Sequence, residues 1–232
     1  MPSTPPPSTK QQREERRAAK VAVLKQQQQR EKRNRLIGII AGSVVGAAAL
    51  ALVIIFIVTS SIPKPDPDTI AIKGVKTWEL QAGNHVDAAE GVDPANPPTV
   101  DYEADYGMNP PAGGNHWAGW LNCGIYTEPQ QNERAVHALE HGAIWVTYDP
   151  EALSDAEITT LQNEVPSTYM VVSPYPGLPA PVVASAWGAQ VQLDGVDDPR
   201  LADFITKYKE SPDGPEYGAA CTGAIDGPGK IA

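Results

Sequence analysis

The chain has 232 residues and a formal net charge of −10, but the charge is divided unevenly along it. Residues 1–35 carry ten Lys and Arg against three Glu, whereas the remainder carries eight basic and twenty-five acidic residues. A basic arm followed by a charge-free stretch is typical of a chain that faces two compartments, and it argues against a simple cytosolic enzyme. The acidic remainder argues against a nucleic-acid partner, which would require clustered Lys and Arg.

Residues 36–58 form one uninterrupted apolar run, LIGIIAGSVVGAAALALVIIFIV. A helix rises about 1.5 Å per residue, so this run is long enough to cross the hydrocarbon core once. The positive-inside rule then predicts a basic cytoplasmic tail over 1–35 and an extracytoplasmic part over 59–232. A cleaved signal peptide is the alternative, and we rank it second because the run is too long and no A-x-A site follows. The sequence therefore predicts a single-pass protein of the cell membrane.

Three glycines, Gly38, Gly42 and Gly46, recur at four-residue spacing within the apolar run. They share one face of a helix and would allow a second helix to approach closely. This spacing favours a homo-oligomer or a partner in a membrane complex. The alternative is that glycine is simply common in membrane helices.

The extracytoplasmic part begins with a Pro-rich linker over 59–68 and continues as one domain over 69–232. Irregularly alternating helix and strand patterns predict an α+β fold with a small mixed or antiparallel sheet and short helices. The helices are expected at 133–141, capped by Asn132 and ended by Gly142, at 154–164 from the Ser154–Glu157 capping box, and at 199–209 after Asp198. The strands are expected at 69–75, 143–148, 169–173, 182–187 and 190–193.

Cys123 and Cys221 are the only two cysteines of the chain, and both lie in the part predicted to be outside. An oxidising compartment favours a disulfide between them, which would tie the coil-rich C-terminus to the core. The alternative is that Cys123 is a metal ligand or a redox thiol, although no C-x-x-C motif supports that interpretation.

All four histidines lie in the extracytoplasmic part, and two of them, His137 and His141, are one helical turn apart. Imidazoles at i and i+4 share a helix face and can hold one metal ion, so we predict a copper or zinc site. We expect His116 and Met108 from the preceding loop to complete it, and a thioether ligand would favour copper. Whether His85 joins is left open. The alternative is that these histidines are packed residues, each satisfied by main-chain oxygens.

The string His137-Ala-Leu-Glu140-His141 also matches the H-x-x-E-H pattern of inverted zincins, in which the glutamate activates water. It resembles insulinase-type peptidases in these five positions only. Those enzymes take a third, glutamate ligand from a downstream helix, whereas Glu210 and Glu216 lie in a Pro- and Gly-containing loop. We therefore rank a zinc hydrolase using Glu140 as base below the other interpretations.

The loop over 115–126 is rich in aromatic residues and fits either a recognition surface or part of the core. We expect at least two of Trp117, Trp120 and Tyr126 to be core residues, because the chain has only two Phe.

Two strings, GGNHWAGWLNCGIY at 113–126 and NERAVHALEHGAIWVTYDP at 132–150, resemble the actinobacterial-type family called domain of unknown function 3105. The resemblance covers most of 70–225. It implies a single-pass protein with a basic N-terminus and an extracytoplasmic domain, and it implies no activity. The first hypothesis for function is therefore a membrane-anchored metal-binding protein, and the second is a non-catalytic cell-envelope assembly or interaction module.

Overall fold

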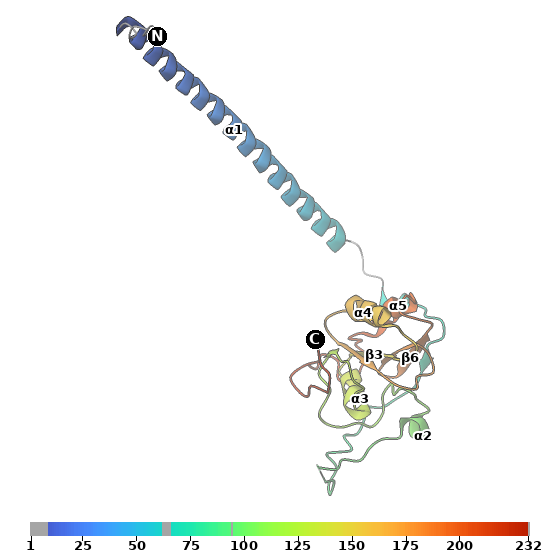
Figure 1. Cartoon of the computed structure of the whole chain (residues 1–232). Helices are drawn as coiled ribbons and strands as arrows, with labels where there is room; N and C mark the ends of the chain where they lie inside the picture. Colours follow the sequence, from blue (N-terminus) through green and yellow to red (C-terminus); the bar gives the residue numbers. More distant parts are fainter. Residues whose placement is uncertain (1–8, 62–65, 94, 232) are drawn as a thin grey trace. The chain divides into compact units, whose positions relative to one another are not determined.

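The structure is a computed structural model that describes residues 9–61, 66–93 and 95–231. The chain divides after Lys64 into two compact units. The first contains a single helix, α1 (Thr9–Ser61), drawn in blue to cyan in Figure 1. Its section from Leu24 to Ile57 is long and apolar enough to cross a membrane. The predicted tail and the predicted span therefore belong to one helix, while residues 1–8 of the tail and 62–65 of the linker lie outside the described residues.

The second unit is an α+β domain built on one six-stranded mixed sheet, as the sequence predicted. The strand order is β1-β6-β5-β3-β4-β2. The pairs β3–β4 and β2–β4 are parallel, and β1–β6, β5–β6 and β3–β5 are antiparallel. The strand bounds are Lys76–Thr77, Gly124–Ile125, Ile144–Tyr148, Met170–Pro174, Val182–Ala186 and Ala189–Leu193 for β1 to β6.

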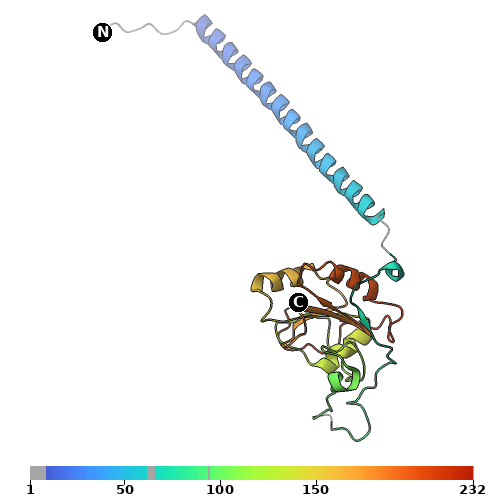
Figure 2. The ribbon, with the colours of Figure 1, turned by 90° about the vertical axis from the view of Figure 1, so that its right-hand side faces the viewer.

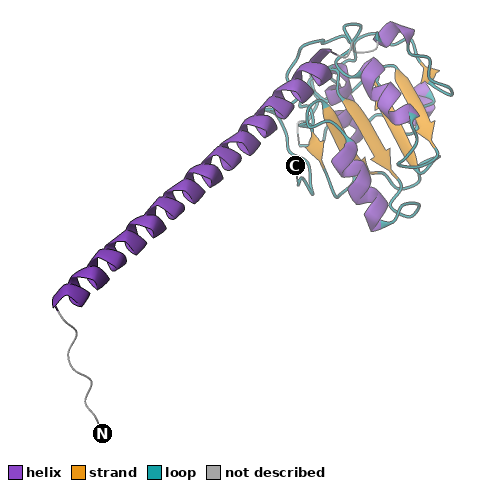
Figure 3. Ribbon diagram, turned by 90° about the horizontal axis from the view of Figure 1, so that it is seen from above, coloured by secondary structure: helices purple, strands orange, loops and turns teal. Residues whose placement is uncertain are grey.

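Helices cover both faces of this sheet. Two helices, α4 (Asp155–Glu164) and α5 (Arg200–Tyr208), lie over one face, and α3 (Asn132–Glu140) lies against the other (Figure 1). The turned view in Figure 2 shows the same layering, and Figure 3 shows helices lying across the strands when the domain is seen from above. Because both faces are covered, the central strands are buried along their whole length and read as nearly continuous apolar runs.

Alternate residues of β3 supply two different cores. Ile144 and Val146 point into the larger core, where Leu161 of α4 and Phe204 of α5 are completely buried. Trp145 points the other way, into the core beneath α3. The two-residue period of the strand thus packs one set of side chains under α4 and α5 and the other set under α3.

For most elements, the bounds predicted from local sequence signals agree with those in the structure to within one or two residues. The capping box of Ser154 and Glu157 opens α4, and Gly142 has φ 94° just after α3, where a left-handed residue ends a helix. Asn132 is the first helical residue of α3 and not its cap, which is Gln131. The Asp198 carboxylate accepts a hydrogen bond from the Arg200 N–H at 3.0 Å at the start of α5.

The strand predicted over 69–75 is wrong. Pro67–Thr69 forms a 3-10 turn, and the paired strand β1 begins only at Lys76. Ile72 and Val75 pack against the larger core from an irregular segment, because Gly74 turns the chain at φ 84°. The apolar spacing therefore reflected burial without strand pairing. A short helix, α2 (Tyr102–Tyr106), lies in the region expected to be all loop.

Candidate metal centre

Helix α3 is buried on almost every side, so its polar residues face the interior. Ala135, Ala138 and Leu139 pack towards the sheet, and Val136 packs against the segment that contains Tyr102. The remaining face carries His137, Glu140 and His141, whose exposed fractions are 3, 2 and 4 %. Buried ionisable groups need partners, so the surroundings of these three side chains decide their chemistry.

Each histidine of the pair uses one ring nitrogen to hold its orientation. His137 Nδ1 lies 2.7 Å from the Trp117 carbonyl oxygen, and His141 Nδ1 lies 2.7 Å from the Ala220 carbonyl oxygen. A carbonyl oxygen only accepts, so both Nδ1 atoms carry the hydrogen. The Nε2 atoms are then the positions left to bind a metal ion. A backbone carbonyl that fixes the tautomer in this way is the usual support of a metal-binding histidine.

His116 follows the same rule. Its Nδ1 donates to the Gly114 carbonyl oxygen at 2.9 Å, and the side chain is completely buried. Its Nε2 lies 2.9 Å from Oε2 of Glu140, as an ion pair or hydrogen bond within the buried interior. Oε1 of Glu140 accepts a hydrogen bond from the Gly83 N–H at 2.8 Å. His116 Nε2 and Glu140 Oε2 therefore face each other at a distance that requires a positive charge between them, either a proton on the nitrogen or a metal ion.

A second contact of this kind involves Glu216, which arrives from the C-terminal coil. Its Oε2 lies 2.9 Å from His141 Nε2 and 3.7 Å from His137 Nε2. The Glu216 N–H donates to the carbonyl oxygen of Glu140 at 3.3 Å, which brings this segment to the end of α3. The side chain of Glu216 is 42 % exposed, so this part of the cluster is open to solvent.

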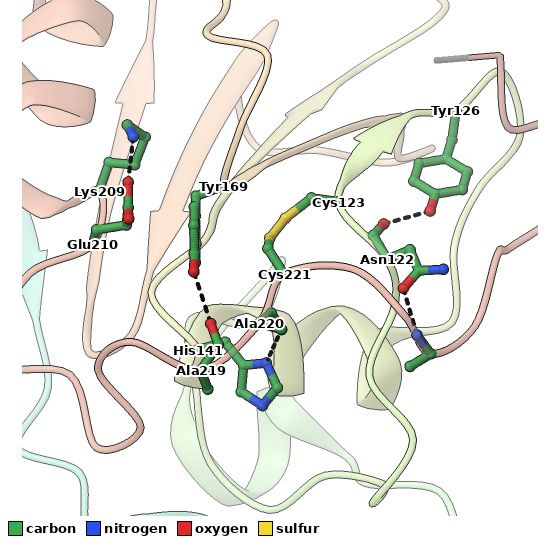
Figure 4. The surroundings of a disulfide bond; sticks show 11 residues. Asn122, Cys123, Tyr126, His141, Tyr169, Lys209, Glu210, Ala219, Ala220 and Cys221 are labelled. Atoms are coloured by element: carbon green, nitrogen blue, oxygen red, sulfur yellow. Dashed lines mark hydrogen bonds and ion pairs between the residues drawn. A yellow bond between two sulfur atoms is a disulfide. The ribbon is translucent and has the colours of Figure 1, made fainter.

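A disulfide joins Cys123 to Cys221, as predicted, and it fixes the same C-terminal segment (Figure 4). The Cys123 N–H also donates to the carbonyl oxygen of Cys221 at 2.7 Å. Ala220, which orients His141, is the residue next to the bridge. The disulfide is therefore one residue away from the carbonyl that orients the His141 ring.

His85 joins the cluster, a point that the sequence left open. Its ring stacks on His137 with centroids 4.9 Å apart and lies 5.0 Å from the His116 ring. The backbone brings it there in a short parallel bridge between His85 and His116, in which the Val86 N–H donates to the His116 carbonyl oxygen and the His116 N–H donates to the Asn84 carbonyl oxygen. His85 is exposed, whereas His116 is not.

Burial and the neighbouring histidines favour the neutral form of the His137 ring. Burial lowers the pKa of His137 to about 4, and the nearby His116, His141 and His85 lower it further against the effect of the Trp117 carbonyl. Burial alone would raise the pKa of Glu140, but the contact with His116 and the Gly83 N–H outweigh it, so the pKa is lowered. A neutral imidazole beside an ionised carboxylate is the protonation state that binds metal.

Within the described residues, two overlapping groups have donor atoms that all lie within 4.8 Å of one another. One comprises His85, His116, His137 and Glu140, and the other comprises His137, His141 and Glu216. Two donors of a tetrahedral ion, each about 2.0–2.2 Å from it, lie roughly 3.3–3.5 Å apart. The measured 2.9 and 3.7 Å contacts lie on either side of that value. Both groups can therefore hold a metal ion.

Met108, the fourth predicted ligand, lies in a different environment. Its Sδ accepts a hydrogen bond from the Ala112 N–H at 3.3 Å, and the side chain is buried with Tyr102 and Val136. The aromatic loop also differs from expectation: Tyr126 is completely buried, but Trp117 and Trp120 are only half-buried. Trp120 instead packs its ring 4.8 Å from that of His141 and shields the cluster.

The alternative of packed histidines satisfied by main-chain oxygens holds for only one nitrogen of each ring. Main-chain oxygens take Nδ1 of His116, His137 and His141, whereas the Nε2 atoms converge on carboxylates. The sequence interpretation set Glu216 aside as a ligand because it lies in a Pro- and Gly-containing loop, but the structure brings it beside His137 and His141. Its position five residues before Cys221 was a further signal that this loop is held near the core.

A family model described as a protein of unknown function, DUF3105, matches residues 99–223, more than half of the chain. The chain belongs to this family, as the two strings had indicated. The matched region contains five of the six clustered donors, all except His85. No curated protein and no solved structure matches the chain.

Proposed function

Since the chain belongs to a family whose description assigns no activity, its function has to come from its own residues, and we propose that it is a membrane-anchored, extracytoplasmic metal-binding protein. The observation that carries this proposal is the arrangement of His116, His137 and His141. Each ring gives Nδ1 to a backbone carbonyl and turns Nε2 towards the others or towards a carboxylate. Such pre-orientation lowers the cost of assembling a metal site.

The donor chemistry supports Zn²⁺ or Cu²⁺. Imidazole nitrogen and carboxylate oxygen suit both ions, whereas Cu⁺ prefers thiolate and thioether sulfur. The two cysteines are joined to each other, and the Met108 sulfur accepts a backbone hydrogen bond. These contacts support an ion held by nitrogen and oxygen ligands.

Glu140 is better suited to hold an ion than to activate water. Both of its oxygens have partners, the Gly83 N–H and the His116 ring, and its side chain is almost fully buried. A general base needs a free oxygen within reach of the attacking water. This engagement supports a binding role over the zinc-hydrolase alternative.

The proposal also places the basic tail in the cytoplasm and the domain outside the cell membrane. A membrane-impermeant amine reagent applied to intact cells should label Lys73 and Lys76, which are exposed in the domain. It should leave Lys20 and Lys25 of the tail unlabelled until the cells are lysed. Labelling of the tail lysines in intact cells would contradict the proposed orientation and place the tail outside.

Metal analysis of the full chain in mild detergent tests the binding proposal. We expect the protein, stripped with a chelator and reloaded, to retain Zn²⁺ or Cu²⁺ after gel filtration. A variant combining His137→Ala and His141→Ala should retain less. Absence of any retained ion, both in protein as purified and after reloading, would refute the proposal.

A further inference from the structure

The donor cluster offers more ligands than one ion accepts. Six side chains contribute, namely His85, His116, His137, His141, Glu140 and Glu216. A zinc ion at a protein site takes four ligands, or three and a water. The six donors therefore exceed what a single zinc ion binds.

His137 is the only member of both donor groups, and it can serve just one ion. Its Nδ1 carries the hydrogen donated to Trp117, which leaves one lone pair, on Nε2. It therefore cannot bridge two ions as an imidazolate without breaking that hydrogen bond. If His137 joins His141 and Glu216, the other group still keeps His85, His116 and Glu140.

Two separate histidine–carboxylate pairs mark where positive charge is held. One is His116 Nε2 with Glu140 Oε2, and the other is His141 Nε2 with Glu216 Oε2, each at 2.9 Å. In the first pair, the side chains of His116 and Glu140 are almost fully buried. A buried nitrogen beside a carboxylate needs a positive charge between them, which either a proton or a metal ion supplies.

We propose, building on the metal-binding function above, that the cluster holds two divalent ions side by side, an inner one on His85, His116 and Glu140 and an outer one on His137, His141 and Glu216. Each set is two histidines and one carboxylate, the ligand type of catalytic zinc sites, which leave a position for water. The inner and outer sets lie next to each other, because the rings of His116 and His141 are 4.6 and 4.7 Å from the intervening ring of His137. Exposed His85 and half-exposed Glu216 give each ion its own route from solvent.

Zinc stoichiometry of the full chain in detergent decides between one and two ions. Chelator-stripped protein is dialysed against a buffered concentration of free Zn²⁺, and bound zinc is measured by elemental mass spectrometry. We expect two Zn²⁺ per chain. One Zn²⁺ per chain would overturn the two-ion proposal and leave the metal-binding function intact, whereas none would refute both.

Matched variants test which residues bind each of the two ions. His116→Ala and Glu140→Gln should each lower the stoichiometry from two to one, and so should His141→Ala and Glu216→Gln. Combining His116→Ala with His141→Ala should remove both ions. Glu133→Gln is the control, because Glu133 is equally buried on the same helix but accepts a hydrogen bond from the Val100 N–H away from both groups.

A second readout does not depend on the variants folding. Wild-type protein loaded with Cu²⁺ should give an electron paramagnetic resonance spectrum broadened by coupling between two neighbouring ions. The spectrum of an isolated Cu²⁺ at full loading would overturn the proposal.

Discussion

The Nδ1–H of His141 donates to the Ala220 carbonyl oxygen at 2.7 Å, across 79 residues of sequence. Ala220 is followed directly by Cys221, so the orientation of this ring depends on a segment held by the disulfide (Figure 4). The same segment carries Glu216. The disulfide therefore holds the segment that supplies both Glu216 and the carbonyl oxygen that orients His141.

Breaking the bridge should weaken the outer group selectively. The variant Cys123→Ser/Cys221→Ser frees the segment that contains Ala220 and Glu216, and support of this kind is worth about 10–100-fold in metal affinity. We expect a loss of that size for the ion that depends on His141, with little change for the one that depends on His116. Titration against a chromophoric chelator measures both.

The same variant should unfold more easily, by about 4–5 kcal/mol if loop entropy dominates for a bridge spanning about 98 residues. Adding a dithiol reductant to the wild type should reproduce the weaker binding. The serine variant, given the same reductant, serves as the control for metal binding by the reductant itself. Equal affinity in oxidised and reduced wild type would show that the bridge does not support the site.

Gly83 is expected to be essential for the inner group. A Cβ atom at this position would overlap the Gly114 carbonyl oxygen and His116 Nδ1, and the Gly83 N–H also holds Glu140. Gly83→Ala should therefore displace His116 and reduce binding by the inner group while the outer group still binds. The control is Gly195→Ala, where an added Cβ meets nothing within 4 Å. Unchanged zinc binding by Gly83→Ala would mean that the close approach of this loop is not required.

Asp198 should make the stability of the domain depend on pH at its acidic end. Hydrogen bonds from the Arg200 side chain hold the pKa of Asp198 at about 2, below its ordinary value of 3.8. Because the folded pKa is lowered, the stabilisation is present above about pH 4 and is lost as the pH falls towards 2. Asp198→Asn should lower the free energy of unfolding by about 1–2 kcal/mol at pH 7.

Urea denaturation at several pH values measures this difference between the two proteins. The difference should shrink steadily below pH 4, since Asp198 binds a proton there in the unfolded chain but only near pH 2 in the folded protein. A constant difference down to pH 2 would show that the negative charge of Asp198 does not stabilise the fold.

The glycine-lined face of α1 should mediate association in the membrane. In the structure, Cβ atoms added at Gly38, Gly42 or Gly46 would meet nothing within 4 Å. Gly42→Ile should therefore leave the helix intact but prevent close approach of a second helix. We expect less crosslinked oligomer or complex in membranes. Ala48→Ile, on a different face of α1, is the control, and equal crosslinking in both variants would contradict this role.

Local signals were sufficient for features that depend on neighbouring residues. The apolar run within α1, the Ser154–Glu157 capping box and the α+β alternation each rest on side chains a few positions apart. The disulfide was also predictable, because only two cysteines exist and both lie on the same side of the span. The strand expected over 69–75 failed because burial of Ile72 and Val75 does not require pairing to a neighbour.

The sequence by itself determined that two histidines and a glutamate share one turn of a helix. Only the tertiary structure decided what faces them, because Gly83 meets Glu140 across 57 residues and Ala220 meets His141 across 79. No periodicity carries information over such separations. The fold places the loops before α3 at one side of the helix, and the disulfide holds the C-terminal coil at its end. Together these segments add three donor side chains to the three at the end of α3.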